Sequence, residues 1–290
     1  MRIAIFGNIY RPVILSHIQV LFEYFKDKKA TILLDKVLYE FVHEQGLINL
    51  EGTVIIESDD FDADLALSIG GDGTFLNTAA RIGRKQIPVL GINTGRLGFL
   101  ADVSNEEIIP ALDAILANQF SIEERALLYV QTSDGTTFDY PYALNEVSVL
   151  KQDSSSMMSI NTSLNGEIVH TYQADGLIVS TPTGSTAYSM SVGGPLVVPQ
   201  AQNIILSPVA SHSLNVRPLI IPDSWVIELE VHSRSQNYLV ALDGRSKVLE
   251  HTTKLHIRKA DYTVKIIKQL NHTFFDTLKN KLMWGVDKRN

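Results

Sequence analysis

The stretch DLALSIGGDGT, residues 64–74, decides the fold of the first part of this chain. A short apolar run ends in three glycines within four residues, and a helix-like segment over 75–82 follows directly. Other strand-like runs (3–6, 31–34 and 88–92) alternate with helix-like runs (13–25, 37–42 and 105–118), the last opened by a capping-box pattern of Ser104 and Glu107. This alternation predicts a doubly wound parallel sheet.

After about residue 123 the pattern changes to alternating β segments, with hairpin signals at Asp134-Gly135 and Asn165-Gly166. This half is predicted to be a β-sandwich or an open barrel. Apolar residues at helical spacing then predict a helix from 274 to 283 that packs on the first domain, because a lone helix is marginally stable.

We therefore expect an α/β plus β fold: an N-terminal doubly wound, Rossmann-like α/β domain over 1–122, an all-β sandwich-like domain over 123–273, and a terminal helix, 274–290, returning to the first domain.

Composition narrows the class of protein. The 290 residues include 25 Lys+Arg, 32 Asp+Glu and no cysteine, for a net charge of −7. This excludes disulfides and thiolate metal sites and argues against a nucleic-acid partner. No apolar stretch is long enough for a membrane span, and residues 1–7 read as a strand rather than a signal peptide, so we expect a cytoplasmic protein without a membrane partner. Residues 247–290 are basic, with a net charge of +6, which fits either an anion-binding face or a solvated surface.

The glycine loop can hold a phosphate, because Gly70, Gly71, Gly73 and Thr74 stand at a strand-to-helix turn where amide N–H groups point outward. Asp72 inside such a loop could hold a metal or accept a proton from an attacking hydroxyl. The spacing matches neither G-x-x-x-x-G-K-[ST] nor G-x-G-x-x-G. The alternative is a tight turn with an Asx-type hydrogen bond.

Two further motifs offer hydrogen bonds without positive charge. The block DGLIVSTPTGSTAY, 175–188, runs from a strand into a hydroxyl-rich loop that suits a base or a ribose, and the alternative is a polar surface loop. Asn145-Glu146 could hold ribose hydroxyls or could decorate a surface. The histidines have no metal-ligand spacing, and His212 alone is more typical of a structural residue.

Together the glycine loop, Asn145-Glu146 and the 175–188 block resemble the three signatures of the NAD kinase family, in the family's order, and 91–100 is similar to the stretch between the first two. The resemblance implies ATP-dependent phosphorylation of the adenosine ribose 2′-hydroxyl of NAD to give NADP. It also implies Asp72 as the proton acceptor and a divalent cation, Mg²⁺, on the ATP phosphates, with no metal ligand assigned in the chain. The implied NAD contacts are Asp72, Gly73, Asn145, Glu146, Gln173, Asp175, Thr183, Thr186, Ala187, Tyr188, Ser189, Met190, Ser191, Ala210 and Arg245.

Two positions depart from the family pattern. Gln173 stands where a basic residue is common, and Arg245 stands where glutamine is common. The glycine loop alone would also fit a diacylglycerol-type lipid kinase or a phosphofructokinase-like sugar kinase, although neither explains the 175–188 block. A non-catalytic NAD-binding sensor is a further alternative. The resemblance implies a homodimer or homotetramer.

Overall fold

The computed structural model describes residues 1–95, 98–152, 157–270 and 272–285. The chain divides into two compact units: Met1–Glu124 with Val264–Asn290, and Arg125–Thr263. Two long strands, β6 (Phe120–Thr132) and β17 (Leu255–Gln269), contribute residues to both units. We describe each unit by itself. The domain boundaries expected from the sequence, after residue 122 and after residue 273, stay predictions.

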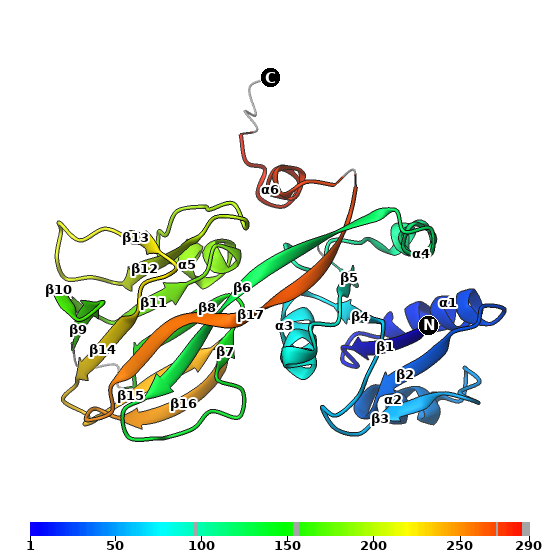
Figure 1. The fold of residues 1–290 in the computed structure, drawn as a ribbon, viewed down its shortest axis with the longest axis horizontal. Helices are drawn as coiled ribbons and strands as arrows, with labels where there is room; N and C mark the ends of the chain where they lie inside the picture. Colours follow the sequence, from blue (N-terminus) through cyan, green and yellow to red (C-terminus); the bar gives the residue numbers. More distant parts are fainter. Residues whose placement is uncertain (96–97, 153–156, 271, 286–290) are drawn as a thin grey trace. The chain divides into compact units, whose positions relative to one another are not determined.

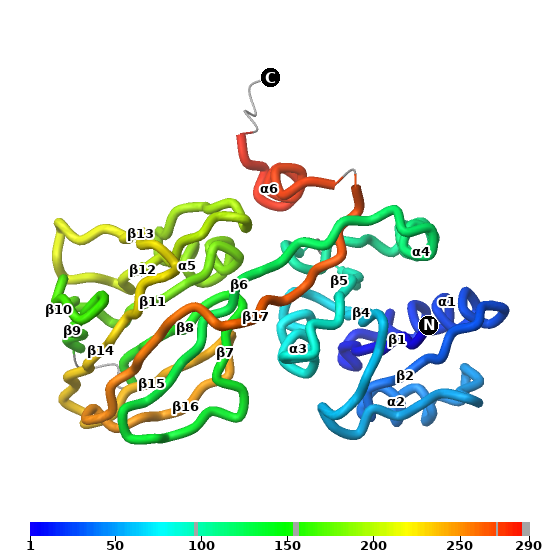
Figure 2. The backbone as a smooth tube through the Cα atoms, in the orientation of Figure 1, coloured from blue at the N-terminus to red at the C-terminus, as the bar shows by residue number. Residues whose placement is uncertain are grey.

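The first unit is built on a parallel sheet in the order β3-β2-β1-β4-β5, joined at β5 by the end of β17 (Figure 1). The elements are β1 (Arg2–Gly7), α1 (Ile14–Phe25), β2 (Thr31–Asp35), α2 (Lys36–Gln45), β3 (Val54–Ile56), β4 (Leu65–Gly70), α3 (Asp72–Ile82), β5 (Val89–Asn93) and α4 (Ile108–Leu116), with short 3-10 turns η1 (Gly83–Lys85) and η2 (Asn105–Glu107). The tube in Figure 2 follows β4 directly into α3.

Helices cover both faces of this sheet, which confirms the doubly wound prediction. Leu67 and Ile69 of β4 share one hydrophobic core with apolar residues of α1, α2 and α4. The alternate residue Ser68 faces α3, where its hydroxyl accepts a hydrogen bond from Thr78. Successive side chains of a strand point to opposite faces, so this alternation sets which helix packs on which side.

Two details differ from the sequence-based expectation. The segment 105–118 is a 3-10 turn followed by α4 over Ile108–Leu116, although the Ser104–Glu107 capping box is present as predicted. Strand β3 was not predicted, because two of its three residues are exposed and its pattern is too short to read.

The second unit is a sandwich of two antiparallel sheets, which confirms the all-β prediction. One sheet has the order β10-β9-β14-β17, with β6 beside β17 and β7 beside β6, and the other has the order β13-β12-β11-β8-β15-β16. Its elements are β7 (Tyr142–Ala143), β8 (Glu146–Lys151), β9 (Met158–Leu164), β10 (Glu167–Ala174), β11 (Gly176–Ser180), η3 (Thr183–Thr186), α5 (Tyr188–Ser191), β12 (Asn203–Val209), β13 (Leu219–Pro222), β14 (Ile227–His232), β15 (Asn237–Leu242) and β16 (Arg245–Glu250). Alternate residues of both sheets, among them Met158 and Val149, form one buried core.

The terminal helix α6 (Phe274–Leu282) belongs to the first unit, as predicted. Thr273 and Asp276 form a capping box at its start, and Leu278 is buried. The part of the predicted tail over 286–290 lies outside the described residues. No helix in the described part of the chain combines the length and the apolar character that crossing a membrane requires.

Candidate active site

The glycine loop joins β4 to α3 and leaves open space in front of it. A Cβ at Gly70 would overlap the Thr74 side chain, so only glycine fits there. At Gly71 and Gly73 a Cβ would meet nothing within 4 Å, so a ligand can approach the backbone closely. The N–H groups of Thr74 and Phe75 donate to the Gly71 carbonyl and start the helix.

The Asp72 carboxylate is held by a second loop. Its Oδ1 accepts hydrogen bonds from the N–H groups of Leu100 at 2.9 Å and Ala101 at 3.1 Å, and its Oδ2 accepts one from Phe99 at 3.0 Å. Gly98 lets this loop close, because a Cβ there would overlap Oδ1 of Asp72 and lie 2.8 Å from the Ala101 carbonyl oxygen. Asp72 therefore bonds across to another segment, rather than within its own turn.

One cation also faces this carboxylate. Nζ of Lys281, near the end of α6, lies 3.3 Å from Oδ2 of Asp72. Oδ1 accepts two amide hydrogen bonds, whereas Oδ2 accepts one and faces the ammonium. A carboxylate oxygen has about two lone-pair sites. Oδ2 is therefore the oxygen that a substrate hydroxyl can reach by displacing the partly exposed Lys281 side chain rather than backbone.

A buried ion cluster stands next to this loop. Asp102 follows Ala101, contacts the ammonium of Lys268, and lies 3.3 Å from Nδ1 of His272, just before α6. Burial by itself would raise the pKa of Asp102, but the hydrogen bond from His272 and the charge of Lys268 lower it overall. The hydrogen bond to Asp102 raises the pKa of His272 against the opposing effect of burial.

This cluster predicts a pH dependence of stability. Because the folded-state pKa of His272 lies above its ordinary value of 6.5, its contribution is complete below that pH and is lost as the pH rises through the folded-state pKa. We expect the thermal midpoint to fall by about 1–3 °C from this source between about pH 6 and pH 9. A His272→Gln variant should lack this component; if it keeps the full decrease, another group is responsible.

In the second unit, Asn145 and Glu146 stand at the break between β7 and β8. Oδ1 of Asp243 accepts hydrogen bonds from the N–H groups of Asn145 at 2.8 Å and Glu146 at 3.1 Å, and Oδ2 accepts one from Leu144 at 2.7 Å. Asp243 thus fixes the backbone of the pair. Burial raises the pKa of the Glu146 carboxyl to about 7, and the charge of Asp243 adds to the shift.

The hydroxyl-rich loop packs onto the same backbone. The Thr181 hydroxyl donates to the Leu144 carbonyl at 2.6 Å, and the Thr181 N–H donates to the Asn145 carbonyl at 2.9 Å. A Cβ at Gly184 would overlap the Asn145 carbonyl oxygen. At the start of α5 the Tyr188 N–H donates to Oε2 of Glu146 at 3.4 Å. The structure therefore brings Asn145, Glu146 and the 181–188 loop together.

The remaining predicted positions around this loop differ in accessibility. Ser191 and the Tyr188 ring are exposed, whereas the Ser189 hydroxyl is buried against that of Ser207. Thr183 is buried, and its carbonyl accepts a hydrogen bond from the Thr186 hydroxyl at 3.3 Å. Ala187 lies between η3 and α5, and Met190 lies in α5.

Arg245 also lies at this end of the sheet. Its Nη2 donates to the Tyr142 carbonyl at 2.6 Å, and its guanidinium lies over the Tyr140 ring. Within the described residues its buried Nη1 has no hydrogen-bond partner.

Asp175, Gln173 and Ala210 lie at the other end of β11. The Asp175 carboxylate pairs with Lys151 at 2.7 Å, and the Gln173 side chain accepts a hydrogen bond from Ser159 at 2.9 Å. Ala210 follows β12 with a positive φ of 45°. Glu146 pairs with Ser180 and Leu150 with Gly176 in the ladder, so the two groups are separated by the length of β11, roughly 13 Å.

Sequence reasoning missed three features of these sites: the amide donors at 99–101, the Asp243 clamp and Lys281. The first had a signal, because 91–100 is one of the stretches that resemble the family, whereas Asp243 had none beyond its place near Arg245. Lys281 had only the basic tail as a signal. Arg96 and Leu97 of the first stretch lie outside the described residues.

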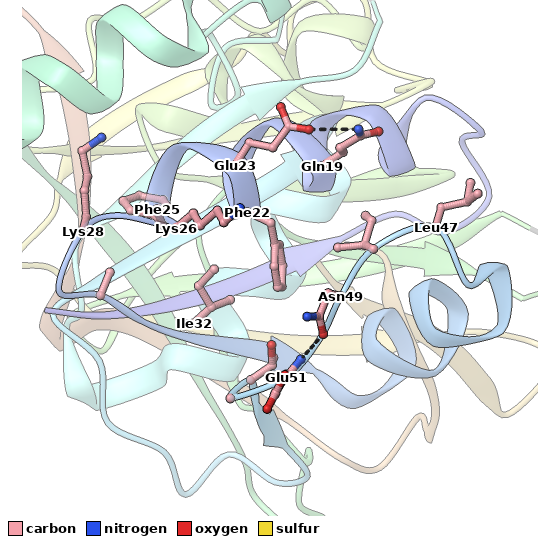
Figure 3. Close-up of a pocket in the computed structure, with 14 residues that line it drawn as sticks. Gln19, Phe22, Glu23, Phe25, Lys26, Lys28, Ile32, Leu47, Asn49 and Glu51 are labelled. Carbon is pink, nitrogen blue, oxygen red and sulfur yellow. Dashed lines mark hydrogen bonds between the residues drawn. The ribbon is translucent and has the colours of Figure 1, made fainter.

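A surface pocket of about 430 Å³ lies elsewhere in the first unit, between α1 and the 47–53 segment (Figure 3). Phe22 and Ile32 line it, with Lys26, Glu23 and Glu51 among its polar residues. It contains none of the predicted site residues and is open to solvent, so it is not the candidate active site.

Protein-family models match segments of both units. The model of the ATP-NAD kinase N-terminal domain matches residues 3–120, and that of the ATP-NAD kinase C-terminal domain matches residues 144–269. An NAD kinase of Bacteroides fragilis is 52% identical over 289 residues, and one of Cytophaga hutchinsonii is 39% identical over 292 residues; both alignments cover 100% of each chain.

Solved structures agree in fold. Yeast NADH kinase in complex with NADH superposes with a TM-score of 0.91 at 20% identity, covering 99% of this chain and 88% of that one. An NAD kinase from Archaeoglobus fulgidus in complex with ATP superposes with a TM-score of 0.75 at 25% identity, covering 98% of this chain and 99% of that one.

Proposed function

The chain belongs to the NAD kinase family, and we propose that it phosphorylates the 2′-hydroxyl of the adenosine ribose of NAD with ATP as donor, giving NADP, with Asp72 as proton acceptor. The observation that carries the role of Asp72 is its carboxylate, fixed by three backbone N–H groups beside an open glycine loop. Fixed geometry of this kind favours proton transfer because the acceptor needs no reorganisation.

The proposed step balances at named atoms. The 2′-hydroxyl oxygen attacks the γ-phosphorus of ATP, its O–H bond breaks, and the proton passes to Oδ2 of Asp72. The bond between the γ-phosphorus and the β,γ-bridging oxygen breaks, and ADP leaves. The N–H groups of the glycine loop, apart from that of Thr74, which donates to the Gly71 carbonyl, would donate to phosphate oxygens.

A divalent cation, Mg²⁺, fits this proposal as a partner of the ATP phosphates. Within the described residues no group of three or more His, Cys, Asp or Glu side chains could hold a metal ion by itself. Mg²⁺ commonly binds through substrate phosphates and water with one or two carboxylates. When bound it would neutralise phosphate charge, and we assign no residue of the chain as its ligand.

For NAD, we propose that Asn145 and Glu146 hold ribose hydroxyls and that the 183–191 segment contacts the adenosine part. Asp175, with Gln173 and Ala210, would serve the nicotinamide end. The separation of the two groups along β11 supports this division, because an extended dinucleotide is long enough to contact both. We also place Arg245, whose buried Nη1 has no hydrogen-bond partner within the described residues, among the NAD contacts.

The proposed activity is tested by incubating the protein with ATP, Mg²⁺ and NAD and coupling the product to an NADP-specific dehydrogenase. We expect NADP formation that a chelator abolishes and that moderate salt reduces only slightly. Absence of product with intact NAD binding would indicate the sensor, and phosphate transfer to diacylglycerol would indicate the lipid kinase.

Glu146 predicts a pH dependence of NAD binding. Because its pKa is about 7 and a carboxylate accepts hydrogen bonds better than a carboxyl, the KM for NAD should fall as the pH rises from about 6 to about 8. The change should be up to about tenfold, since the ionised fraction rises by that factor. Glu146→Gln should raise the KM at pH 8 and flatten its dependence; an unchanged profile would remove the ribose role.

We further propose a homo-oligomer located in the cytoplasm. Strand β10 is an edge of its sheet and exposes Ile168 and Val169, and such edges favour association. Light scattering coupled to gel filtration measures the mass, and a monomer at micromolar concentration would contradict the proposal.

A further inference from the structure

The structure assigns a role to the terminal helix: we propose that Lys281 is a positioning residue that neutralises Asp72 and orients its Oδ2, so that the carboxylate can stand beside the ATP phosphates. This inference rests on the proposed function of Asp72 and of the glycine loop. The observation behind it is the 3.3 Å approach of Nζ to Oδ2.

Several independent contacts place Lys281 there. Its ammonium lies over the Phe99 ring, 4.5 Å from the centroid, and Phe99 is the residue whose N–H donates to the same Oδ2. The Phe99 and Phe274 rings are 6.1 Å apart, which ties the start of α6 to the same loop. One residue before the capping box, His272 pairs with Asp102. Both ends of the helix are thus attached to the 99–102 segment.

Lys281 is needed for an electrostatic reason, because Asp72 and the ATP phosphates are both negatively charged. A carboxylate inside a phosphate-binding loop repels a polyanion, and nearby like charges are costly where water is partly excluded. None of the glycine-loop residues, 70–74, is basic. Lys281 supplies the missing positive charge on a helix that comes from the far end of the chain. Its side chain is about 30% exposed, so the ammonium can turn toward water when a substrate hydroxyl approaches Oδ2.

The test is a double-mutant cycle on nucleotide binding, read by titrating the full chain with Mg²⁺ and a non-hydrolysable ATP analogue. Lys281→Met should weaken binding of the analogue about tenfold. In an Asp72→Asn background, where the carboxylate charge is gone, the same change should cost less than about twofold. Lys281→Arg should restore binding, and the KM for NAD should stay within about twofold of the wild-type value.

Lys279→Met is the matched control, because it removes the same charge from the same exposed helix without touching Asp72. It should leave binding of the analogue unchanged. Equal losses in Lys279→Met and Lys281→Met would mean that the general charge of the tail matters and not the pair. The proposal would also be overturned if Lys281→Met weakened binding of the analogue equally in the wild-type and Asp72→Asn backgrounds, or if Lys281→Met bound the analogue more tightly than wild type.

The cycle separates this inference from the proposed function. Full turnover in Asp72→Asn would refute the base role while the binding cycle still reports on Lys281. Loss of turnover in Asp72→Asn together with wild-type binding and turnover in Lys281→Met would refute the positioning role alone.

Discussion

Asp72→Asn should lower kcat by about 10²–10⁴-fold, the range that general base catalysis contributes, while NAD still binds. Asparagine has the size of aspartate but cannot take the proton of the 2′-hydroxyl. Single-turnover measurements at saturating NAD and ATP give the size of the effect. Near-normal turnover would show that another group, or water, accepts the proton.

The Asp72→Asn variant needs a control for structural change, because the Asp72 carboxylate accepts three backbone hydrogen bonds from the 99–101 segment. An asparagine amide presents N–H toward the Phe99 N–H or the Lys281 ammonium, so the 98–101 loop loses one favourable contact. Thermal unfolding and NAD titration distinguish this local effect from loss of chemistry. A thermal midpoint within about 3 °C of wild type, with NAD affinity retained, would assign the loss of turnover to the proton transfer.

Gly184→Ala should have the largest effect on folding among the substitutions considered. The new Cβ would lie 2.5 Å from the Asn145 carbonyl carbon and 2.6 Å from the Ser180 hydroxyl. Relief requires backbone movement, because the nearest atoms belong to the main chain that carries Asn145 and Glu146. We expect a loss of about 2–4 kcal/mol in the free energy of unfolding, together with weaker NAD binding.

Gly166→Ala is the matched control for Gly184→Ala. Gly166 lies in a hairpin of the same unit with φ of +84°, and a Cβ there meets nothing within 4 Å. This change should cost only about 1 kcal/mol from backbone strain and leave NAD binding intact. A Gly184→Ala protein as stable as the Gly166→Ala protein would mean that the loop can shift without cost.

Hydrophobic periodicity and turn and capping residues predicted the architecture well, because they indicate which side chains are buried and where strands and helices begin and end. The run at 64–74 ends β4 and begins α3, and the alternation of Leu67, Ser68 and Ile69 sets the two faces of the sheet. The capping box at Ser104 and the helical spacing after 273 also appear as predicted. Short exposed β3 was missed because its pattern has too little periodicity to read.

The sequence motifs predicted which residues form the candidate site, but not the contacts that hold those residues in place. Asp72 could be singled out because a carboxylate in a glycine loop is unusual, whereas Glu146 gained its weight from the resemblance to the family. The Asp72 carboxylate accepts hydrogen bonds from the backbone N–H groups of 99–101, and the Glu146 carboxylate accepts one from the Tyr188 N–H. Backbone donors have no sequence signature, since every residue except proline carries one.

The sequence by itself determined the class of fold and the glycine-rich turn between β4 and α3, and it predicted the residue types offered to a nucleotide, because these follow from periodicity and chemistry over short stretches. Only the tertiary structure decided which oxygen of Asp72 faces an ammonium, that burial and the charge of Asp243 raise the pKa of Glu146, and that Lys281 faces Asp72 from more than 200 positions along the chain. Such contacts depend on how distant segments pack, and electrostatic effects fall off with distance in space rather than with separation in sequence.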